Sequence, residues 1–240
     1  MVMRWLRLFP GLLAVLTVPV LLVTSAVRWE VSDLRLYRVG FVRQGVERAT
    51  GISLSDLMAI AGELHRYLVT GKEPLAVQWQ GRSLFTEVEV LHMRDVKGLM
   101  QGVFRAQEGA GAYLLAYLAV GLLLGRGAFL RGWAKQVLWG SLLTLGVMGL
   151  AGVILVAAFP WAFTLFHLAS FRNPFWQLDP SRHYLVRLFP QGFWFEAALG
   201  VGLLAAAGAV LVALAAAGLL RAIPPRSRAW REFLSSWPFP

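Results

Sequence analysis

The sequence has 240 residues, of which 58% are hydrophobic and only 15% are charged, and its mean hydropathy is +0.61. These values exclude an ordinary soluble domain, because too few polar residues remain to cover its surface. The absence of cysteine excludes disulfide frameworks, thiolate nucleophiles and cysteine-ligated metal centres. The net charge of +10 comes from dispersed Lys and Arg, so we expect it to reflect orientation in a membrane and expect no nucleic-acid partner.

Four apolar stretches approach the roughly 20 residues that a helix needs to cross a bilayer. The predicted fold class is mainly α, a four-helix transmembrane bundle with a small extracytoplasmic α subdomain that includes a β-hairpin. The predicted order is a cytoplasmic N-terminus with the first span (1–27), an extracytoplasmic subdomain (28–111), a second span (112–124, or from near 104 if the helix is tilted), a cytoplasmic loop (125–136), a third span (137–159), an aromatic-rich extracytoplasmic loop (160–196), a fourth span (197–220) and a cytoplasmic tail (221–240).

Charges beside the spans predict the orientation. Nine basic residues and one acid flank the spans at the N-terminus, the short loop and the tail, whereas the other segments contain fourteen basic residues and twelve acids. The positive-inside rule therefore predicts that both termini are cytoplasmic. The first span could instead be a signal peptide, but its apolar run exceeds the 7 to 15 residues of an ordinary signal core.

The first extracytoplasmic segment contains patterns of local structure. Ser53 is a candidate N-cap, and Gly71 a candidate stop, for an amphipathic helix. Its apolar face comprises Leu57, Ile60, Ala61, Leu64 and Leu68. Residues 77–85 alternate around Gly81 and predict a small hairpin, after which Thr86 and Glu89 have the spacing of a capping box.

All four histidines, at positions 65, 92, 167 and 183, fall in the extracytoplasmic segments. Histidine titrates near neutrality, so it can act as a general base or acid. Glu89 and Asp95 are spaced by three residues from His92 and could flank its imidazole, although Glu89 has the alternative role of the capping box. His167 lies in the aromatic loop, where a lipid ester would approach. His65 and His183 are expected to be solvated.

Other chemistries are not indicated. No HxxxH or HExxH spacing predicts a metal site, and no phosphate loop, dinucleotide fingerprint or GxSxG elbow is present, so we expect no metal and no cofactor. The arginines that could bind an anion or stabilise an oxyanion are Arg94, Arg172, Arg182 and Arg187. Exposed arginine is more often simply solvated, and the spacing does not separate these alternatives.

Two blocks, LFTEVEVLHMRDVKGL (84–99) and FHLASFRNPFWQLDPSRHYLVRLFPQGFW (166–194), resemble the lipoprotein intramolecular transacylase (Lit) family of bacterial integral membrane proteins. The resemblance covers most of the chain and matches the four-span topology, with a looser match over 28–83. It maps the two functional histidines of the family to His92 and His167. Thr86, His183 and Gln191 depart from the usual Asn, Asp and Glu of the family.

The resemblance implies transfer of the sn-2 acyl chain of a diacylglyceryl-modified N-terminal cysteine to the α-amine of that same residue. The partners would be a diacylated lipoprotein and membrane lipid, and the active site would face the extracytoplasmic side of the cell membrane. Supporting or substrate-binding roles are expected for Glu89, Asp95, Arg94, Arg172, Asp179 and Arg187. The alternative is a non-catalytic receptor-like or assembly protein with incidental histidines. The sequence leaves the oligomeric state open.

Overall fold

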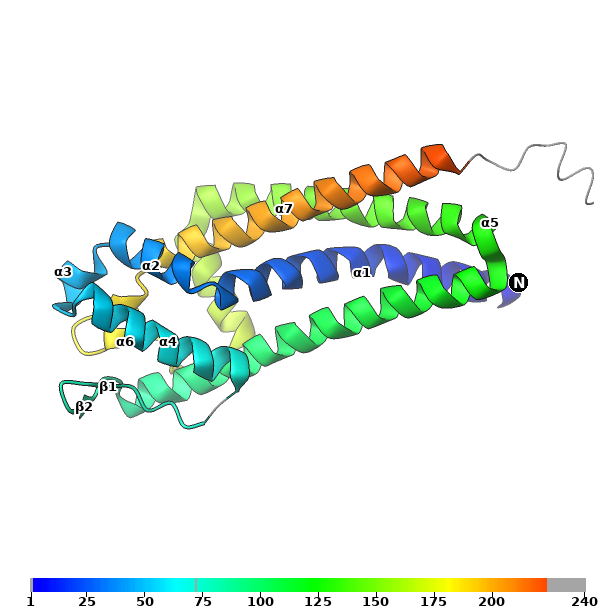
Figure 1. Cartoon of the computed structure of the whole chain (residues 1–240). Helices are drawn as coiled ribbons and strands as arrows, with labels where there is room; N and C mark the ends of the chain where they lie inside the picture. The colour runs from blue at the N-terminus through cyan, green and yellow to red at the C-terminus, as the bar shows by residue number, and fades with distance from the viewer. Residues whose placement is uncertain (1, 72, 224–240) are drawn as a thin grey trace, which may run out of the picture.

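A computed structural model describes residues 2–71 and 73–223 of the chain. The elements are α1 (Val2–Ser32), α2 (Leu34–Arg43), α3 (Val46–Thr50), α4 (Leu54–Thr70), β1 (Gln78–Trp79), β2 (Arg82–Ser83), α5 (Glu87–Ser170), α6 (Tyr184–Leu188) and α7 (Gln191–Ala222). The predicted class is confirmed: the chain is mainly α, with a bundle of long apolar helices and a small sheet at one end of it (Figure 1).

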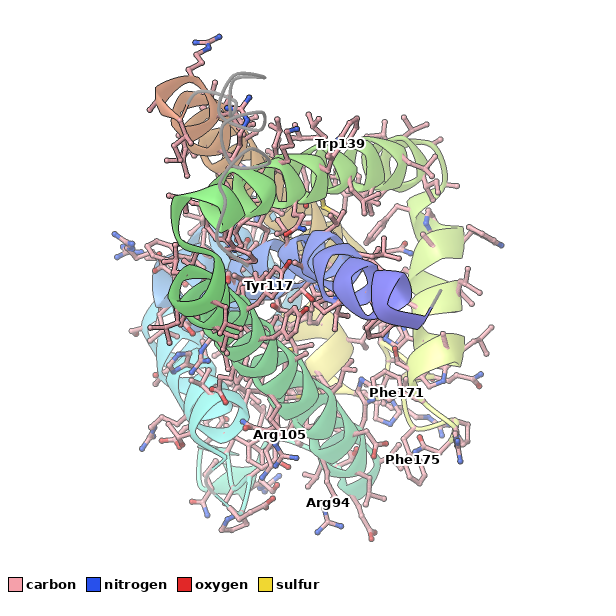
Figure 2. All side chains as sticks on the ribbon, turned by 90° about the vertical axis from the view of Figure 1, so that its right-hand side faces the viewer. Arg94, Arg105, Tyr117, Trp139, Phe171 and Phe175 are labelled. Carbon is pink, nitrogen blue, oxygen red and sulfur yellow. The ribbon has the colours of Figure 1, made fainter. Side chains whose placement is uncertain are left out.

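Four helical segments are long and apolar enough to cross a membrane, and they are longer than the spans predicted from the sequence. Their bounds are Phe9–Ser32, Glu87–Leu124, Phe129–Ser170 and Gln191–Ala222. Large apolar side chains such as Leu123, Leu124 and Val156 are exposed on them, as expected of a surface that faces lipid. Figure 2 shows Trp139 on the outside of the bundle. The predicted tail lies outside the described residues beyond 223.

The helix α5 contains two of these segments. It has 84 residues, so a straight helix would be about 126 Å long. Instead it doubles back, and we call Glu87–Leu124 its first limb and Phe129–Ser170 its second limb (Figure 1). The second limb changes direction near Pro160, because proline lacks the backbone N–H that would bond to the carbonyl four residues earlier. The segment after Pro160 crosses the end of the bundle toward the start of the first limb (Figures 1 and 2).

The start of the first limb projects beyond the apolar part of the bundle. The limb has 38 residues, which corresponds to about 57 Å, nearly twice the roughly 30 Å of a hydrocarbon core. Its first turns contain the charged residues Glu87, Glu89, Arg94, Asp95 and Lys97. We therefore expect these turns, and the segment after Pro160 that approaches them, to lie outside the hydrocarbon core.

Small residues allow the bundle helices to approach closely. A Cβ added to Gly140 would lie 2.6 Å from Cβ of Val18 and 2.7 Å from the carbonyl oxygen of Val15, so the second limb touches the backbone of α1. Gly121 lies beneath the ring of Phe129. Its small size thus allows the reversal of α5 to pack.

The helix α4 forms where the amphipathic pattern predicts it. Ser53 Oγ accepts a hydrogen bond from the backbone N–H of Asp56 (3.2 Å), which satisfies one free donor of the first turn. Gly71 ends the helix with φ at 74°, a backbone conformation that favours glycine. All of the predicted apolar face is buried. The cap, the stop and the buried face are therefore confirmed.

The hairpin and the capping box are also confirmed. The strands β1 and β2 pair antiparallel around Gln80 and Gly81, which both have positive φ, as a tight two-residue turn requires. The Thr86 backbone N–H then donates to Glu89 Oε2 (2.8 Å), and the Glu89 N–H donates to Thr86 Oγ1 (3.5 Å). This box fixes where the first limb begins.

The segments 33–86 and 171–190, which we call the head subdomain, pack on the end of the bundle. Their shared core joins α2, α3 and α4 to α6 and to the beginning of the first limb. Phe41 packs against Phe189 and Phe193, with ring centroids 5.6 and 6.1 Å away. Aromatic residues of the predicted loop 160–196 thus join the head subdomain to α7.

Candidate active site

His92 lies in the second turn of the first limb, directly after the capping box. Its side chain is 8% exposed, and its Nδ1 is buried without a hydrogen-bond partner among the described residues. Its ring packs edge to face against the ring of Phe171, with centroids 5.2 Å apart and planes at 76°. The helix start therefore holds the imidazole in an apolar surrounding.

His167 lies in the last turn of the second limb, in the segment redirected at Pro160. It is also 8% exposed. Its Nδ1 lies 2.7 Å from the carbonyl oxygen of Phe163, so Nδ1 is protonated and donates, and Nε2 of the neutral ring has a free lone pair. Rings of Phe163 and Trp176 lie 4.3 and 5.0 Å from the imidazole.

The fold brings the two histidines together. Their ring centroids are 6.1 Å apart and their planes differ by 31°. Two imidazoles at this separation can act on opposite sides of one small reacting group. The kink at Pro160 makes this possible, because it directs the end of the second limb back toward the first.

Burial affects the protonation of both imidazoles. Burial, with a contribution from the nearby His167, lowers the pKa of His92 to about 4, while Asp95 opposes this shift. Burial also lowers the pKa of His167, against the effect of its hydrogen bond to Phe163. Both rings are therefore neutral at pH 7, the form in which an imidazole can accept a proton.

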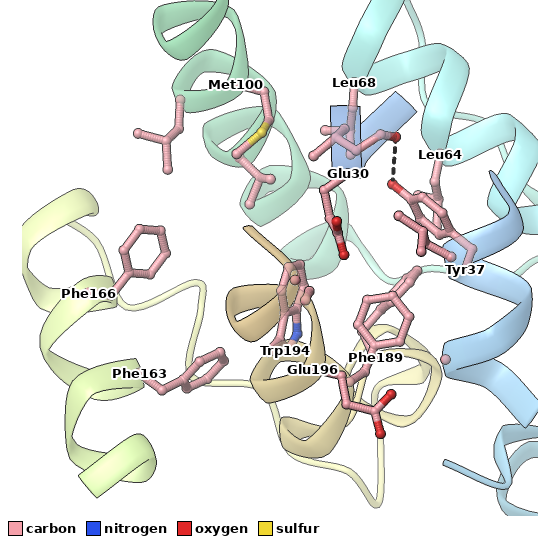
Figure 3. A pocket seen from close by; sticks show the side chains of 18 of the residues that line it. Glu30, Tyr37, Leu64, Leu68, Met100, Phe163, Phe166, Phe189, Trp194 and Glu196 are labelled. Atoms are coloured by element: carbon pink, nitrogen blue, oxygen red, sulfur yellow. Dashed lines mark hydrogen bonds between the residues drawn. The ribbon is translucent and has the colours of Figure 1, made fainter. Parts of the chain in front are cut away.

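A cavity of about 720 Å³ extends from the histidines between the head subdomain and the bundle. Its walls are almost entirely apolar and aromatic, and they include Phe163 and Phe166 on one side and Trp194 on α7 (Figure 3). The cavity reaches Leu203 and Leu204. Its volume lies within the 300 to 1,000 Å³ of typical ligand pockets, and its lining suits hydrocarbon chains.

The sequence pattern of the family described as "Lipoprotein intramolecular transacylase Lit" matches residues 12–194 of this chain, well over half of its length. The chain belongs to the Lit family. The match includes both histidines and the head subdomain.

Solved structures of a Lit protein share the fold. An in meso structure of the membrane integral lipoprotein intramolecular transacylase Lit from Bacillus cereus superposes with a TM-score of 0.78 at 18% identity, covering 89% of this chain and 95% of that one. A structure of a point-substituted variant gives 0.75 at 17% identity, covering 98% and 96%. With the four apolar helices, this likeness identifies a multi-pass membrane protein.

A curated relative is more similar in sequence but matches over a shorter region. An uncharacterized protein of Aquifex aeolicus (strain VF5) is 27% identical over 132 residues, which is 55% of this chain. The match spans 56% of that relative's length.

In this Lit chain Glu89 does not orient His92. The carboxylate is fully buried; Oε2 accepts from the N–H and O–H of Thr86 (both 2.8 Å), and Oε1 accepts from the backbone N–H of Leu185 (2.7 Å). Among the described residues no hydrogen bond joins Glu89 to the imidazole, and the capping-box alternative is confirmed. Glu89 also joins the first limb to α6, which the sequence pattern did not predict.

Asp95 lies near His92 but bonds elsewhere. Its Oδ2 accepts from the side-chain amide of Asn173 (2.8 Å), and the amide oxygen of Asn173 accepts from the N–H of Phe175 (3.1 Å). Asp95 therefore attaches the aromatic segment after Phe171 to the first limb. Its negative charge still favours the protonated form of His92.

The remaining predicted residues do not line the cavity. Arg94 and Arg172 are exposed, and Figure 2 shows Arg94 pointing away from the protein. Arg187 stacks on Tyr184, 4.1 Å from the ring centroid. Asp179 is exposed in a turn, where it accepts from the N–H of Ser181 (2.8 Å).

The departures from the Lit pattern have local explanations. Thr86 still caps the first limb. His183 occupies the N-cap of α6, but its side chain makes no capping hydrogen bond within the described residues. The backbone N–H of Leu185, which an N-cap side chain could bind, donates to Glu89 instead. Gln191 begins α7, whose first turn has no acid. These exchanges therefore lie around the cavity rather than in it.

Two further histidines lie apart from the pair. His183 Nδ1 accepts from the N–H of Asp179 (2.9 Å). His65 was expected to be solvated, but it is half-buried and its Nε2 has no partner among the described residues. Within residues 2–71 and 73–223, no group of three or more His, Asp or Glu side chains could hold a metal ion.

Sequence patterns missed several polar groups of the cavity wall. Glu30, Tyr37, Arg43 and Glu196 all line it. The only sequence signal for Glu30 is an acid directly after an apolar span. No periodicity indicated that α2 would face the start of α7.

Proposed function

We propose that this protein is an intramolecular acyltransferase that moves the sn-2 acyl chain of a diacylglyceryl-modified N-terminal cysteine onto the α-amine of that cysteine. The product is a lyso-form, N-acylated lipoprotein. Membership of the Lit family supports this activity. The single observation that favours it most is the pair of neutral, buried imidazoles, 6.1 Å apart, on the wall of an apolar cavity.

The cavity and the histidines have complementary roles. The apolar walls accept the acyl chains, and the polar ester and amine then lie where the only two imidazoles of the described cavity wall meet. Nucleophile and ester belong to one molecule, so holding them in a reactive orientation supplies much of the acceleration. No covalent acyl-enzyme and no energy source are needed, because an ester is exchanged for a more stable amide.

We assign the base to His167. Its Nδ1–H donates to Phe163, so Nε2 is the atom free to take a proton from the amine as nitrogen attacks the ester carbonyl. The protonated imidazole then returns this proton to the departing glycerol oxygen. The C–N bond forms, the C–O bond breaks, and the proton moves from nitrogen to oxygen, so no other reactant is required.

We assign stabilisation of the tetrahedral oxyanion to His92. An N–H of its neutral ring can donate to oxygen, and the surrounding apolar groups strengthen that interaction. The pKa of about 4 makes the imidazolium of His92 rare at neutral pH, so it can donate without repelling the ammonium of an arriving substrate.

The rival hypothesis of a non-catalytic receptor-like or assembly protein fits less well. It predicts a closed aromatic core between the histidines. Both histidines instead line the cavity.

The proposed site lies on the extracytoplasmic side, with both termini in the cytoplasm. The excess of basic residues in the N-terminal segment, the short loop and the tail of the sequence supports this orientation. Diacylated lipoproteins present their N-terminal cysteine at the membrane surface, so a diacylated lipoprotein and membrane lipid are the expected partners.

Mass spectrometry of a lipoprotein's N-terminal lipopeptide tests the proposal. A diacylated lipoprotein would be co-expressed with the wild type, His92→Ala, His167→Ala or His183→Ala. His183 is the matched control, because it is also a histidine of the predicted extracytoplasmic segments but does not line the cavity. Fragmentation should show one chain moved from glycerol to nitrogen at constant total mass with wild type and the control.

We expect each cavity variant to lose at least about a hundredfold in transfer, the usual contribution of a general acid or base. Full transfer by a double variant that carries both His92→Ala and His167→Ala would refute the mechanism. An unmodified diacyl lipopeptide in the presence of well-folded wild type would favour the assembly hypothesis.

A further inference from the structure

Glu30 is an acidic side chain in the largely apolar wall of the cavity. It lies two residues before the end of α1 and is half-buried. Its carboxylate points into the cavity beneath the head subdomain (Figure 3). A carboxylate in such surroundings is unfavourable unless a cation or hydrogen-bond donors accompany it.

The described residues supply no such partner. No hydrogen bond or ion pair to Glu30 forms within residues 2–71 and 73–223. The neighbouring Arg28 donates to Gln107 (2.9 Å) and Glu108 (3.0 Å) instead. The hydroxyl of Tyr37 donates to the carbonyl oxygen of Val31 (3.3 Å) rather than to the acid.

The other acid of the cavity wall differs in this respect. Glu196 accepts from the side-chain amide of Gln44 (3.0 Å) and lies 3.6 Å from a guanidinium nitrogen of Arg43. Two carboxylates therefore face one cavity, and only Glu196 is neutralised by the described protein.

The position of Glu30 depends on a glycine of α7. A Cβ added at Gly200 would lie 2.6 Å from Oε1 of Glu30, so the carboxylate fills the space left by the missing side chain. Burial, with the nearby charge of Glu30, raises the pKa of Tyr37 to about 12. Both observations locate the acid between α1, α2 and α7, at the junction of bundle and head subdomain.

We propose that Glu30 binds the α-ammonium of the diacylated cysteine and thereby selects lipoproteins whose N-terminus is still free. This inference rests on the proposed function. An α-amine has a pKa near 8, so most of it is a cation at pH 7 and matches the unneutralised acid. The cavity receives the acyl chains while Glu30 receives the charge.

The same contact favours release of the product. Transfer converts the ammonium into a neutral amide, with one proton left to solvent, so the attraction to Glu30 disappears. Because the contact stabilises the bound ammonium and is lost before the transition state, Glu30→Gln should raise KM about tenfold and should raise kcat rather than lower it. A merely structural role would lower kcat as well.

The test uses lipopeptides that cannot react. Two dialkylglyceryl-cysteine peptides with ether-linked chains would be compared, one with a free α-amine and one with hydrogen in its place. Binding to the purified full-length protein in nanodiscs would be measured for wild type, Glu30→Gln and the matched control Glu196→Gln. We expect wild type and the control to prefer the amine about tenfold and Glu30→Gln to lose the preference.

A second variant, Gly200→Ala, displaces the Glu30 carboxylate without removing it, and should reduce the preference in the same direction. Equal binding of both probes by wild type, or an unchanged preference in Glu30→Gln, would overturn the inference. The probes report binding alone, so a preference without any acyl transfer would leave Glu30 as an amine site and refute the proposed function. Acyl transfer by a wild type that binds both probes equally would support the proposed function and refute the role of Glu30.

Discussion

Glu89→Gln tests whether this buried acid is a structural tie or an acid–base partner of His92. The carboxylate accepts three hydrogen bonds, from the N–H and O–H of Thr86 and from the N–H of Leu185. A glutamine has the same shape but replaces one accepting oxygen with a donating NH₂ group. Whichever way the amide is turned, one backbone N–H then faces another donor.

The magnitude follows from that count. A buried donor left without a partner costs about 1 to 3 kcal/mol. For a protein of this size, about 2 to 4 °C of unfolding temperature corresponds to each kcal/mol, so we expect a decrease of about 2 to 12 °C. Glu89→Ala leaves both backbone donors without an acceptor and should cost about twice as much. Acyl transfer should fall along with stability, because His92 lies one turn farther along the same helix.

The assay is thermal unfolding of the purified protein, followed by transfer measured across a range of pH. Glu87→Gln is the matched control, since Glu87 is an exposed acid in the same first turn, and we expect a change below about 0.5 kcal/mol for it. The result that refutes the reasoning is a Glu89→Gln protein of wild-type stability with a displaced pH profile. That outcome would make Glu89 a partner of the imidazole after all.

Two further predictions concern pH and packing. The pKa of His92 is about 4 in the folded protein and near 6.5 in the unfolded chain, so the unfolded state binds more protons between these pH values. The free energy of unfolding should therefore be full above pH 6.5 and fall by about 3 kcal/mol toward pH 4. A His92→Asn protein should show a flatter pH dependence of its unfolding temperature. Gly140→Ala should destabilise the bundle by about 1 to 3 kcal/mol, because its Cβ would meet Val18 and the backbone of Val15. Gly146→Ala should change stability little, because the new Cβ would meet no atom of the described residues within 4 Å. Equal unfolding temperatures of the two variants would contradict this packing.

Local patterns predicted local structure well. The cap and stop of α4, the hairpin around Gly81 and the box at Thr86 all depend on residues within a few positions of one another. Such interactions form wherever the chain goes, so sequence spacing is sufficient to identify them. The family motifs similarly identified His92 and His167 as candidates, and the chain belongs to that family.

The partner of Glu89 could not be predicted in this way. Its spacing from His92 allowed a contact, but the carboxylate turns toward Leu185, 96 residues farther along the chain. A helix periodicity states which residues share a face and not what that face meets. The contact of Glu89 with Leu185 depends on how α5 bends and on where α6 then packs against the first limb.

The sequence by itself determined a multi-pass α-helical membrane protein, its family and the caps of α4 and α5, and it identified the two histidines as candidates. The tertiary structure decided that the second limb bends near Pro160 and brings the ring centroid of His167 to 6.1 Å from that of His92. It also decided that Glu30, in the same cavity, has no partner among the described residues. The physical reason is the range of the interactions. Caps, turns and apolar faces are properties of short segments, whereas a cavity and the neutralisation of a buried charge depend on every segment that packs around them.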